Sequence, residues 1–103
     1  MKFHPFSIRQ RFVAYKYRKK EFESVIKIAN KHLSKNPNDI YMLELRARAS
    51  ISLRKWNQAL KWYHRVFQIN SSYLDCSFQL ARCAIYTQNW SMLDIVASNN
   101  IHD

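Results

Sequence analysis

The sequence repeats itself with a period of 34 residues, and this period constrains the fold more than any other feature. Phe22, Trp56 and Trp90 are separated by that interval. Three further sets recur in phase with these aromatic residues, two of small or medium side chains and one of larger apolar ones: Val13, Ala47 and Ala81; Val25, Ala59 and Leu93; Leu33, Phe67 and Ile101. A repeat of this length is typical of paired helices that stack side by side. The period therefore indicates an architecture before it indicates any chemistry.

The composition agrees with a helical fold. The chain of 103 residues contains no glycine, on which phosphate-cradling loops depend for backbone conformations with positive φ. Hydrophobic residues make up 48% of the chain, which is enough for a packed core. No segment approaches the roughly 20 apolar residues of a membrane span. We therefore expect one small, soluble, cytoplasmic domain built from helices.

Apolar residues at spacings of three and four predict the helices. The expected ranges are residues 7–18, 21–34, 40–53, 56–69 and 73–86, followed by a short helix that starts at 90 and fades near 99–100. Pro37 ends the second helix because proline has no amide donor, and Asn38 or Asp39 is expected to cap the third. The repeat units then span residues 6–39, 40–73 and 74–103 of one domain that covers residues 1–103.

Side-chain size predicts how these helices pack. Small residues such as Ala47 and Ala81 allow the helix axes to approach closely. Trp56 and Trp90 are expected to fill the gaps between neighbouring pairs. The apolar stripe of the first helix consists of three residues at helical spacing, namely Ile8, Phe12 and Tyr15.

The repeat resembles the tetratricopeptide repeat, a helix-turn-helix unit with small and aromatic residues at set positions. The middle unit carries the large, small and aromatic residues of that motif: Leu43, Ala47, Trp56, Ala59, Tyr63 and Val66. Ser71 replaces the usual closing proline, and Arg46 takes a place that is normally apolar. The other units match at Phe12, Val13, Phe22, Ala29 and Pro37, and at Leu80, Ala81 and Trp90. The resemblance implies an all-α fold, a right-handed superhelical stack of antiparallel helix pairs that forms a tetratricopeptide-like α-solenoid.

In that family the first helix of each pair lines a concave groove that holds an extended peptide or a partner helix. The resemblance therefore implies a partner-binding surface that includes Tyr17, Tyr41, Glu44, Arg48, Gln79 and Arg82, with Gln10 and Ala14 also on the groove side. Arg48 and Arg82 are one repeat apart, so their guanidinium groups are suited to hold the carboxylates of an acidic ligand. The alternative carries equal weight: both arginines pair at the surface with Glu44 or Gln79.

Charge is distributed unevenly along the chain. Residues 1–37 contain ten Lys and Arg against two acids, whereas residues 73–103 contain one against three. The densest run of basic residues consists of Arg9, Arg11, Lys16, Arg18, Lys19 and Lys20. This gradient predicts an anionic partner near the first helix pair, such as an acidic protein or, by peripheral contact, an anionic membrane. Ordinary solvated surface charge is an equally weighted alternative, and nucleic acid is a weaker one.

No residue pattern favours an enzyme, a metal site or a cofactor. The chain has only seven Asp and Glu residues, and its four histidines are scattered singly. Cys76 and Cys83 are seven residues apart, which on a helix separates them by roughly 10 Å, too far for a disulfide. We therefore expect free, reduced thiols and no catalytic residues, metal ligands or cofactor.

Two functional hypotheses remain open. The first is a non-catalytic scaffold that binds an acidic peptide, helix or subunit through the groove and the basic first helix pair. The alternative is an N-terminal docking or oligomerisation domain of a larger bacterial enzyme, such as a glycan-processing transferase, because the array ends without a polar capping helix. The candidates for pairing two chains at the C-terminal edge are Ile95, Val96 and Ile101.

Overall fold

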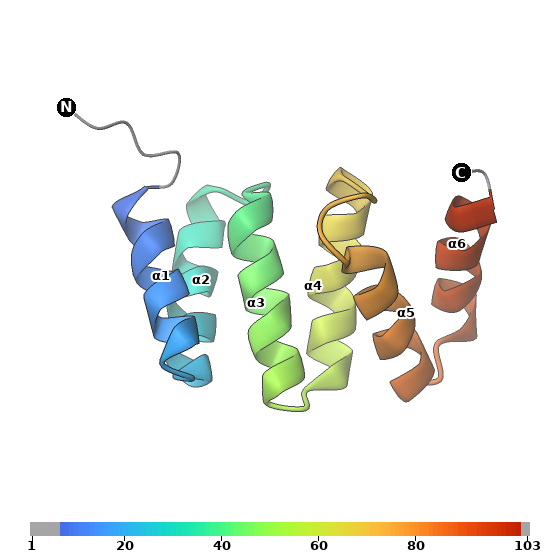
Figure 1. Ribbon diagram of the computed structural model, residues 1–103, viewed down its shortest axis with the longest axis horizontal. Helices are drawn as coiled ribbons and strands as arrows, with labels where there is room; N and C mark the ends of the chain where they lie inside the picture. Colours follow the sequence, from blue (N-terminus) through green and yellow to red (C-terminus); the bar gives the residue numbers. More distant parts are fainter. Residues whose placement is uncertain (1–6, 102–103) are drawn as a thin grey trace.

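The computed structural model describes the backbone of residues 7–101 and the side chains of residues 7–99. Over these residues it contains six helices and no strand (Figure 1). They are α1 (Ile8–Arg18), α2 (Phe22–Lys35), α3 (Ile40–Ser52), α4 (Trp56–Ile69), α5 (Cys76–Tyr86) and α6 (Trp90–Ile101). The all-α prediction is confirmed. The expected start of the fifth helix at residue 73 is wrong, and α6 runs beyond the expected fading point.

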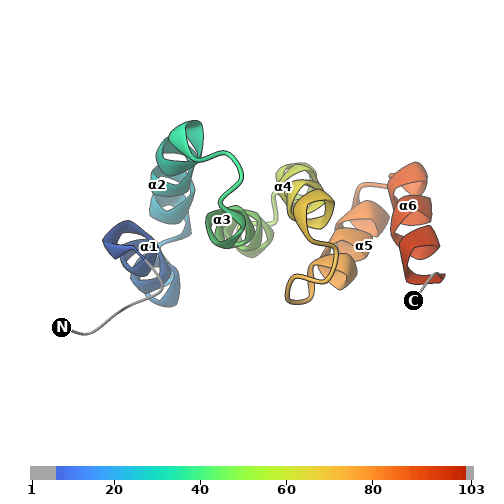
Figure 2. The same cartoon turned by 90° about the horizontal axis from the view of Figure 1, so that it is seen from above.

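The helices stack in sequence order, each packed against the next. Seen from above, α1, α3 and α5 form one row and α2, α4 and α6 form the other (Figure 2). The result is an elongated molecule of 45 × 28 × 23 Å. Helix α3 packs against α1 in its own row and against α2 and α4 in the other row. Its residues can therefore contribute to surfaces on both sides of the stack.

The periodic residues form the core where a neighbouring unit covers them. Val13, Val25, Ala47 and Ala59 are fully buried between the helices. Trp56 stacks on Tyr86 of α5, with ring centroids 4.0 Å apart and planes 6° apart, and thereby joins the second unit to the third as expected. Burying small residues at these positions allows the helix axes to approach closely.

The two ends of the stack depart from the expected packing. Trp90 is 57% exposed, so it fills no gap between helix pairs. The spacing of Ile8, Phe12 and Tyr15 predicted the helix α1 correctly, but all three side chains are exposed and Val13 is the buried residue of that helix. Both departures have one cause: within residues 7–101 no further helix pair precedes α1 or follows α6 to cover these side chains.

The turn inside each unit uses a left-handed residue that is not glycine. Lys20, Arg54 and Gln88 have φ values of 62°, 57° and 57°, and they follow one another at the 34-residue interval of the repeat. In each turn the next amide reaches back five residues, as when Lys55 donates to the Ser50 carbonyl at 2.8 Å. This hydrogen bond satisfies a carbonyl at the end of the first helix, which explains why the strained conformation is kept.

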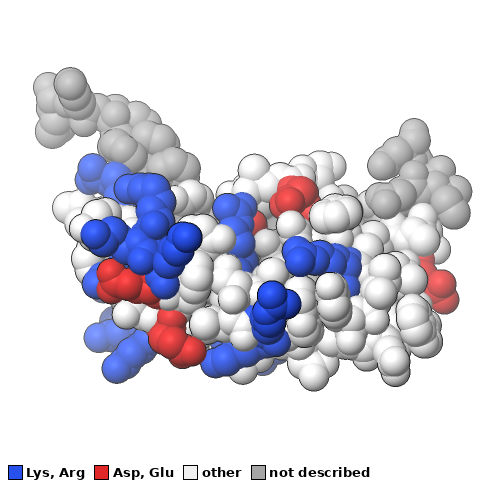
Figure 3. Space-filling view, turned by 60° about the horizontal axis from the view of Figure 1, so that its bottom comes forward, with Lys and Arg blue, Asp and Glu red and all other residues white. Residues whose placement is uncertain are grey.

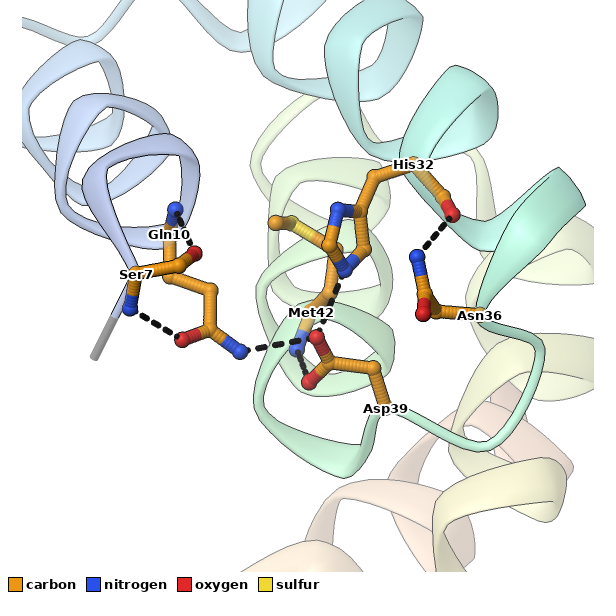
Figure 4. A network of polar contacts seen from close by, with 6 residues as sticks. All are labelled: Ser7, Gln10, His32, Asn36, Asp39 and Met42. Carbon is orange, nitrogen blue, oxygen red and sulfur yellow. Dashed lines mark hydrogen bonds and ion pairs between the residues drawn. The ribbon is translucent and has the colours of Figure 1, made fainter. Parts of the chain in front are cut away.

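Asp39 connects the first three helices through its side chain (Figure 4). Its Oδ1 accepts a hydrogen bond from the Met42 amide at 3.2 Å and so caps α3. Its Oδ2 accepts from Gln10 Nε2 on α1 and from His32 Nε2 on α2, both at 2.7 Å. Gln10 also completes a capping box with Ser7 at the start of α1. Asp39 is therefore the cap of α3, and Gln10 is used here rather than in the groove.

Candidate partner-binding groove

A cavity of about 240 Å³ lies between α1, α3 and the loop that precedes α5. It is lined by Ala14, Tyr17, Arg18, Tyr41, Glu44, Leu45, Arg48, Tyr73 and Leu74. It opens on the row of α1, α3 and α5, the side on which the groove was expected. The structure thus brings together four residues of the predicted partner surface, Tyr17, Tyr41, Glu44 and Arg48, and adds Arg18 from the predicted basic run.

Glu44 forms the floor of this cavity and is only 3% exposed. Its Oε2 accepts hydrogen bonds from Arg48 Nε at 3.0 Å, from Arg48 Nη2 at 2.6 Å and from the Tyr63 hydroxyl at 3.0 Å. Arg48 lies one helical turn after Glu44 on α3, whereas Tyr63 comes from α4 and is fully buried. The buried carboxylate thus has both a counter-ion and a neutral donor, which is what a buried charge requires.

The protonation equilibria of this cluster reflect its burial. Burial, followed by the negative charge of Glu44, raises the pKa of Tyr63 above its ordinary value. For Arg48, burial opposes ionisation, but the Glu44 carboxylate outweighs it and raises the pKa of the guanidinium. Arg48 therefore stays charged, Tyr63 stays neutral, and the charges of Glu44 and Arg48 cancel inside the cavity.

Aromatic rings form the walls of the groove. The Arg48 guanidinium lies over the Tyr17 ring, 5.7 Å from its centroid, and Tyr17 makes an edge contact with Phe22 at 5.3 Å. Across the cavity, burial followed by the charge of Glu44 raises the pKa of Tyr73. A cavity of this kind is suited to an apolar or aromatic side chain of a partner.

The remaining predicted groove residues, Gln79 and Arg82, lie on α5 outside this cavity. The Arg82 guanidinium lies over the rings of Trp56 and Tyr86, 5.1 Å and 6.0 Å from their centroids, and is 3.5 Å from Gln79 Oε1. In the free chain Arg48 therefore contacts Glu44 and Arg82 contacts Gln79, as in the alternative. Joint binding of an acidic ligand by the two arginines stays a prediction.

The basic run predicted on the first helix is on the surface. Lys and Arg side chains gather at the end of the stack that carries α1 and α2 (Figure 3). Arg9, Arg11, Arg18 and Lys19 are exposed, whereas Lys16 forms an ion pair with Glu21 at 3.0 Å. The sixth member of the run, Lys20, is exposed in the left-handed turn described above. Its use in partner binding stays a prediction.

Sequence reasoning missed two residues of the groove, Tyr73 and Leu74. Both were assigned to the fifth helix, but they belong to a loop in which Leu74 has φ 47°. The loop places Tyr73 beside α3 and delays the start of α5 to Cys76. Asn70 and the two serines after it signal a turn, but they do not give its length.

Residues 7–99 contain no group of three His, Cys, Asp or Glu side chains placed to hold a metal ion. Cys76 and Cys83 are free and fully buried, and burial raises the pKa of Cys83 to about 11. No helix among the described residues is both long enough and apolar enough to span a membrane.

Comparison with known proteins places the chain in a family. No curated protein matches it significantly. Residues 17–91, well over half of the chain, match the family described as anaphase-promoting complex, cyclosome, subunit 3. The match agrees with the helix pairs, the 34-residue period and the buried small residues described above. This chain therefore belongs to the anaphase-promoting complex, cyclosome, subunit 3 family of tetratricopeptide-like repeat proteins.

Proposed function

We propose that this chain is a non-catalytic scaffold that binds an acidic segment of a partner protein in the groove between α1 and α3. Tetratricopeptide-like repeats are protein-protein interaction modules, so the family supports the general role and leaves the ligand open. The observation that favours an acidic ligand is the internal pairing of Glu44. Its charge is taken up by Arg48 and Tyr63, and the groove therefore presents no free negative charge of its own.

The charge at the mouth of the groove is positive. Arg18 lines the cavity, is exposed and forms no ion pair with any described residue. Arg11 and Lys19 extend the positive surface along α1. An acidic side chain of the partner next to an inserted apolar side chain would face Arg18, while the apolar group packs on Tyr17 and Tyr41.

The size of the cavity fits side chains of a peptide. Its volume is about 240 Å³. It is sufficient for one or two side chains of a segment that lies across α1 and α3. The remaining contacts would come from the surface of the row formed by α1, α3 and α5.

The test is the binding of a blocked, fluorescently labelled peptide of alternating Glu and Leu, followed by anisotropy at low and high salt. A peptide with Gln in place of Glu is the neutral control. We expect Arg18→Gln and Tyr41→Ala to weaken binding by about tenfold, and high salt to weaken it further. Arg54→Gln, which removes an exposed charge that does not line the groove, should have little effect. Equal binding of the two peptides would contradict the proposal.

Self-association is a second candidate function, favoured by the exposed apolar residues of α6. Trp90 and Ile95 are 57% and 47% exposed. The expected contribution of Val96 is wrong, because this residue is 3% exposed and belongs to the core, and the side chain of Ile101 lies outside the described residues. Light scattering after size exclusion should then find a dimer at low and high salt that Ile95→Asp dissociates. A wild-type monomer would remove this candidate. Docking within a larger enzyme and contact with an anionic membrane stay predictions.

A further inference from the structure

Arg46 of α3 is a buried cation whose hydrogen-bond acceptors are all neutral. Arg46 as a whole is only 5% exposed. The guanidinium donates from Nε to Asn30 Oδ1 at 2.7 Å, from Nη1 to Ser50 Oγ at 2.5 Å and from Nη2 to Gln58 Oε1 at 3.1 Å. No described Asp or Glu forms an ion pair with it. Its positive charge is thus held in place but not neutralised.

The position itself does not require a charge. At the 34-residue interval, the equivalents of Arg46 are Phe12 and Leu80, and Leu80 is fully buried. Burial lowers the pKa of Arg46 below its ordinary value, with no opposing contribution from an acid. An apolar residue would fill the same place without the penalty of burying an unpaired charge. The arginine therefore calls for an explanation beyond packing.

Arg46 lines a cavity of about 600 Å³ between α2 and α4. Lys61 and Arg65 of α4 line the same cavity, and no Asp or Glu is among its lining residues. Arg65 is hydrogen-bonded to the neutral side chain of Asn38. Three cations therefore surround one space without a described counter-ion.

The other side of the cavity is apolar. Leu33 and Pro37 line it from α2 and the following turn, and Trp62 lines it from α4. The Arg46 guanidinium lies over the Trp62 ring, 5.0 Å from its centroid, which together with three hydrogen bonds fixes its orientation. A guanidinium has five N–H donors in a plane that matches a carboxylate. Three of these donors are used internally, so two remain for a ligand.

We propose that this cavity is a second binding site, which holds an acidic side chain of a partner protein against Arg46 while a neighbouring apolar side chain packs on Leu33 and Trp62. The apolar lining favours an acidic protein segment over a free inorganic anion, which would leave that lining unused. Lys61 and Arg65 would complete the neutralisation of further acidic residues at the rim.

This site is separate from the groove. Glu44 and Arg48 line the groove, and Arg46 lies between them in sequence, so it points to the opposite side of α3. The proposal for the second site therefore does not depend on peptide binding in the groove. Binding in the groove likewise does not depend on the second site. Two separate sites would let the scaffold contact one partner on both rows of helices, or two partners at once.

The experiment is an NMR titration of the ¹⁵N-labelled chain with three probes: a blocked peptide of alternating Glu and Leu, the same peptide with Gln in place of Glu, and inorganic phosphate. The reporters are the Trp62 indole N–H and the Arg46 Nε–H resonances. We expect the Glu peptide to shift both and the Gln peptide to shift neither. The double variant Lys61→Gln, Arg65→Gln should weaken the binding that these reporters detect by about tenfold or more.

The matched control is Arg9→Gln with Lys19→Gln, which removes the same charge from exposed residues of α1 and should leave the Trp62 titration unchanged. Arg18→Gln should also leave it unchanged, which distinguishes this site from the groove. Arg46→Met should abolish the Trp62 shift, with circular dichroism as the check on folding. The proposal is overturned if the Gln peptide shifts Trp62 equally, if phosphate shifts it and the Glu peptide does not, or if the double variant binds as the wild type does.

Discussion

Glu44 connects α3 to α4 through a buried hydrogen-bond cluster. One carboxylate oxygen receives three donors, two from Arg48 on the same helix and one from Tyr63 on the next. The carboxylate and the tyrosine are shielded from water, since Glu44 is 3% exposed and Tyr63 is fully buried, whereas the Arg48 side chain is 39% exposed. Loss of one partner in such a cluster leaves the others without compensation.

Glu44→Gln should therefore lower the free energy of unfolding by about 2–3 kcal/mol, measured in urea, because Arg48 loses its counter-ion. Glu23→Gln is the control, since Glu23 is exposed and lies 3.6 Å from Lys55, and it should change stability by less than about 0.5 kcal/mol. In a double-mutant cycle, Glu44→Gln and Tyr63→Phe should be strongly non-additive. Additive losses would show that the buried hydrogen bond is not formed.

Cys83 makes stability depend on alkaline pH. Burial raises its pKa from 9.0 to about 11, so the folded state holds the thiol proton more tightly than the unfolded state does. The contribution is complete below about pH 9 and is lost as the pH rises towards 11. Between about pH 8 and pH 10.5, we expect a loss of about 2 kcal/mol from this residue in urea unfolding. Cys83→Ala should be less stable at every pH but should show a shallower decline; an unchanged decline would assign the effect elsewhere.

At the residue scale, the sequence predicts pairs within a helix better than contacts between helices. The pairing of Glu44 with Arg48 was an open alternative because residues four apart share a helix face. The third member, Tyr63, was assigned to the motif by size, and its hydroxyl contact depends on how α4 docks. Arg46 departs from the motif, but two of its neutral acceptors, Asn30 and Gln58, come from the neighbouring helices α2 and α4 and could not be predicted.

Capping differs between the helices, and α3 offers the sharpest test. Asp39 caps it and also binds Gln10 and His32, whereas Asp75, the N-cap residue of α5, forms no capping hydrogen bond. Asp39→Ala should therefore lower the free energy of unfolding by about 2 kcal/mol, and Asp75→Ala by less than about 0.5 kcal/mol. Thermal and urea unfolding of both variants would show this difference. Equal losses would mean that Asp39 acts only as a surface charge.

The left-handed turns predict a gain in stability. Arg54 has φ 57°, a conformation that glycine adopts without steric strain. Arg54→Gly should raise the free energy of unfolding by about 0.5–1 kcal/mol, partly offset by the greater freedom of glycine in the unfolded chain. Lys55→Gly is the matched control, because Lys55 has φ −92°, and it should destabilise the protein. A loss in both variants would contradict the inferred strain.

At the element scale, most helix ends were predictable because proline, capping residues and apolar spacing mark them. The exception was the region before α5. Residues 73–75 have helix-compatible sequences, yet Leu74 takes φ 47° and the helix begins at Cys76. The thiol of Cys76 contacts the carbonyls of Asn70 and Ser71 at 3.6 Å and 3.5 Å, a local arrangement that periodicity does not reveal.

For the whole molecule, the contact between the second and third units includes an aromatic stack. Tyr86 of α5 stacks on Trp56 of α4, and Arg82 lies over both rings. Tyr86→Ala should lower amide-exchange protection in α5 and α6 by the equivalent of about 1–2 kcal/mol while α2 and α3 keep theirs. Phe78→Ala, at an aromatic residue of α5 that is 67% exposed, should have little effect. Uniform loss of protection would mean that the stack unfolds as one unit.

The repeat period predicts the stack of helices but treats all units as equivalent. Trp56 and Trp90 occupy the same place in the repeat, yet one is partly buried against α5 and the other is 57% exposed. The same applies to Leu80, fully buried, and Phe12, 47% exposed. The contacts of a repeated residue depend on whether another repeat unit packs against it. The sequence of a single repeat does not say whether such a neighbour is present.

The elongated shape and the uneven charge together give the molecule an electric dipole along its 45 Å axis. Among the described residues, its positive pole is the end that carries α1 and α2, where residues 7–37 contain nine Lys and Arg against two acids, and at the other end residues 73–99 contain one Arg against two acids. In the field of an anionic body, such a dipole rotates before contact. The molecule would therefore approach an anionic partner with α1 facing it. The exposed apolar residues of α6 would then face away from that partner and stay accessible to a second molecule.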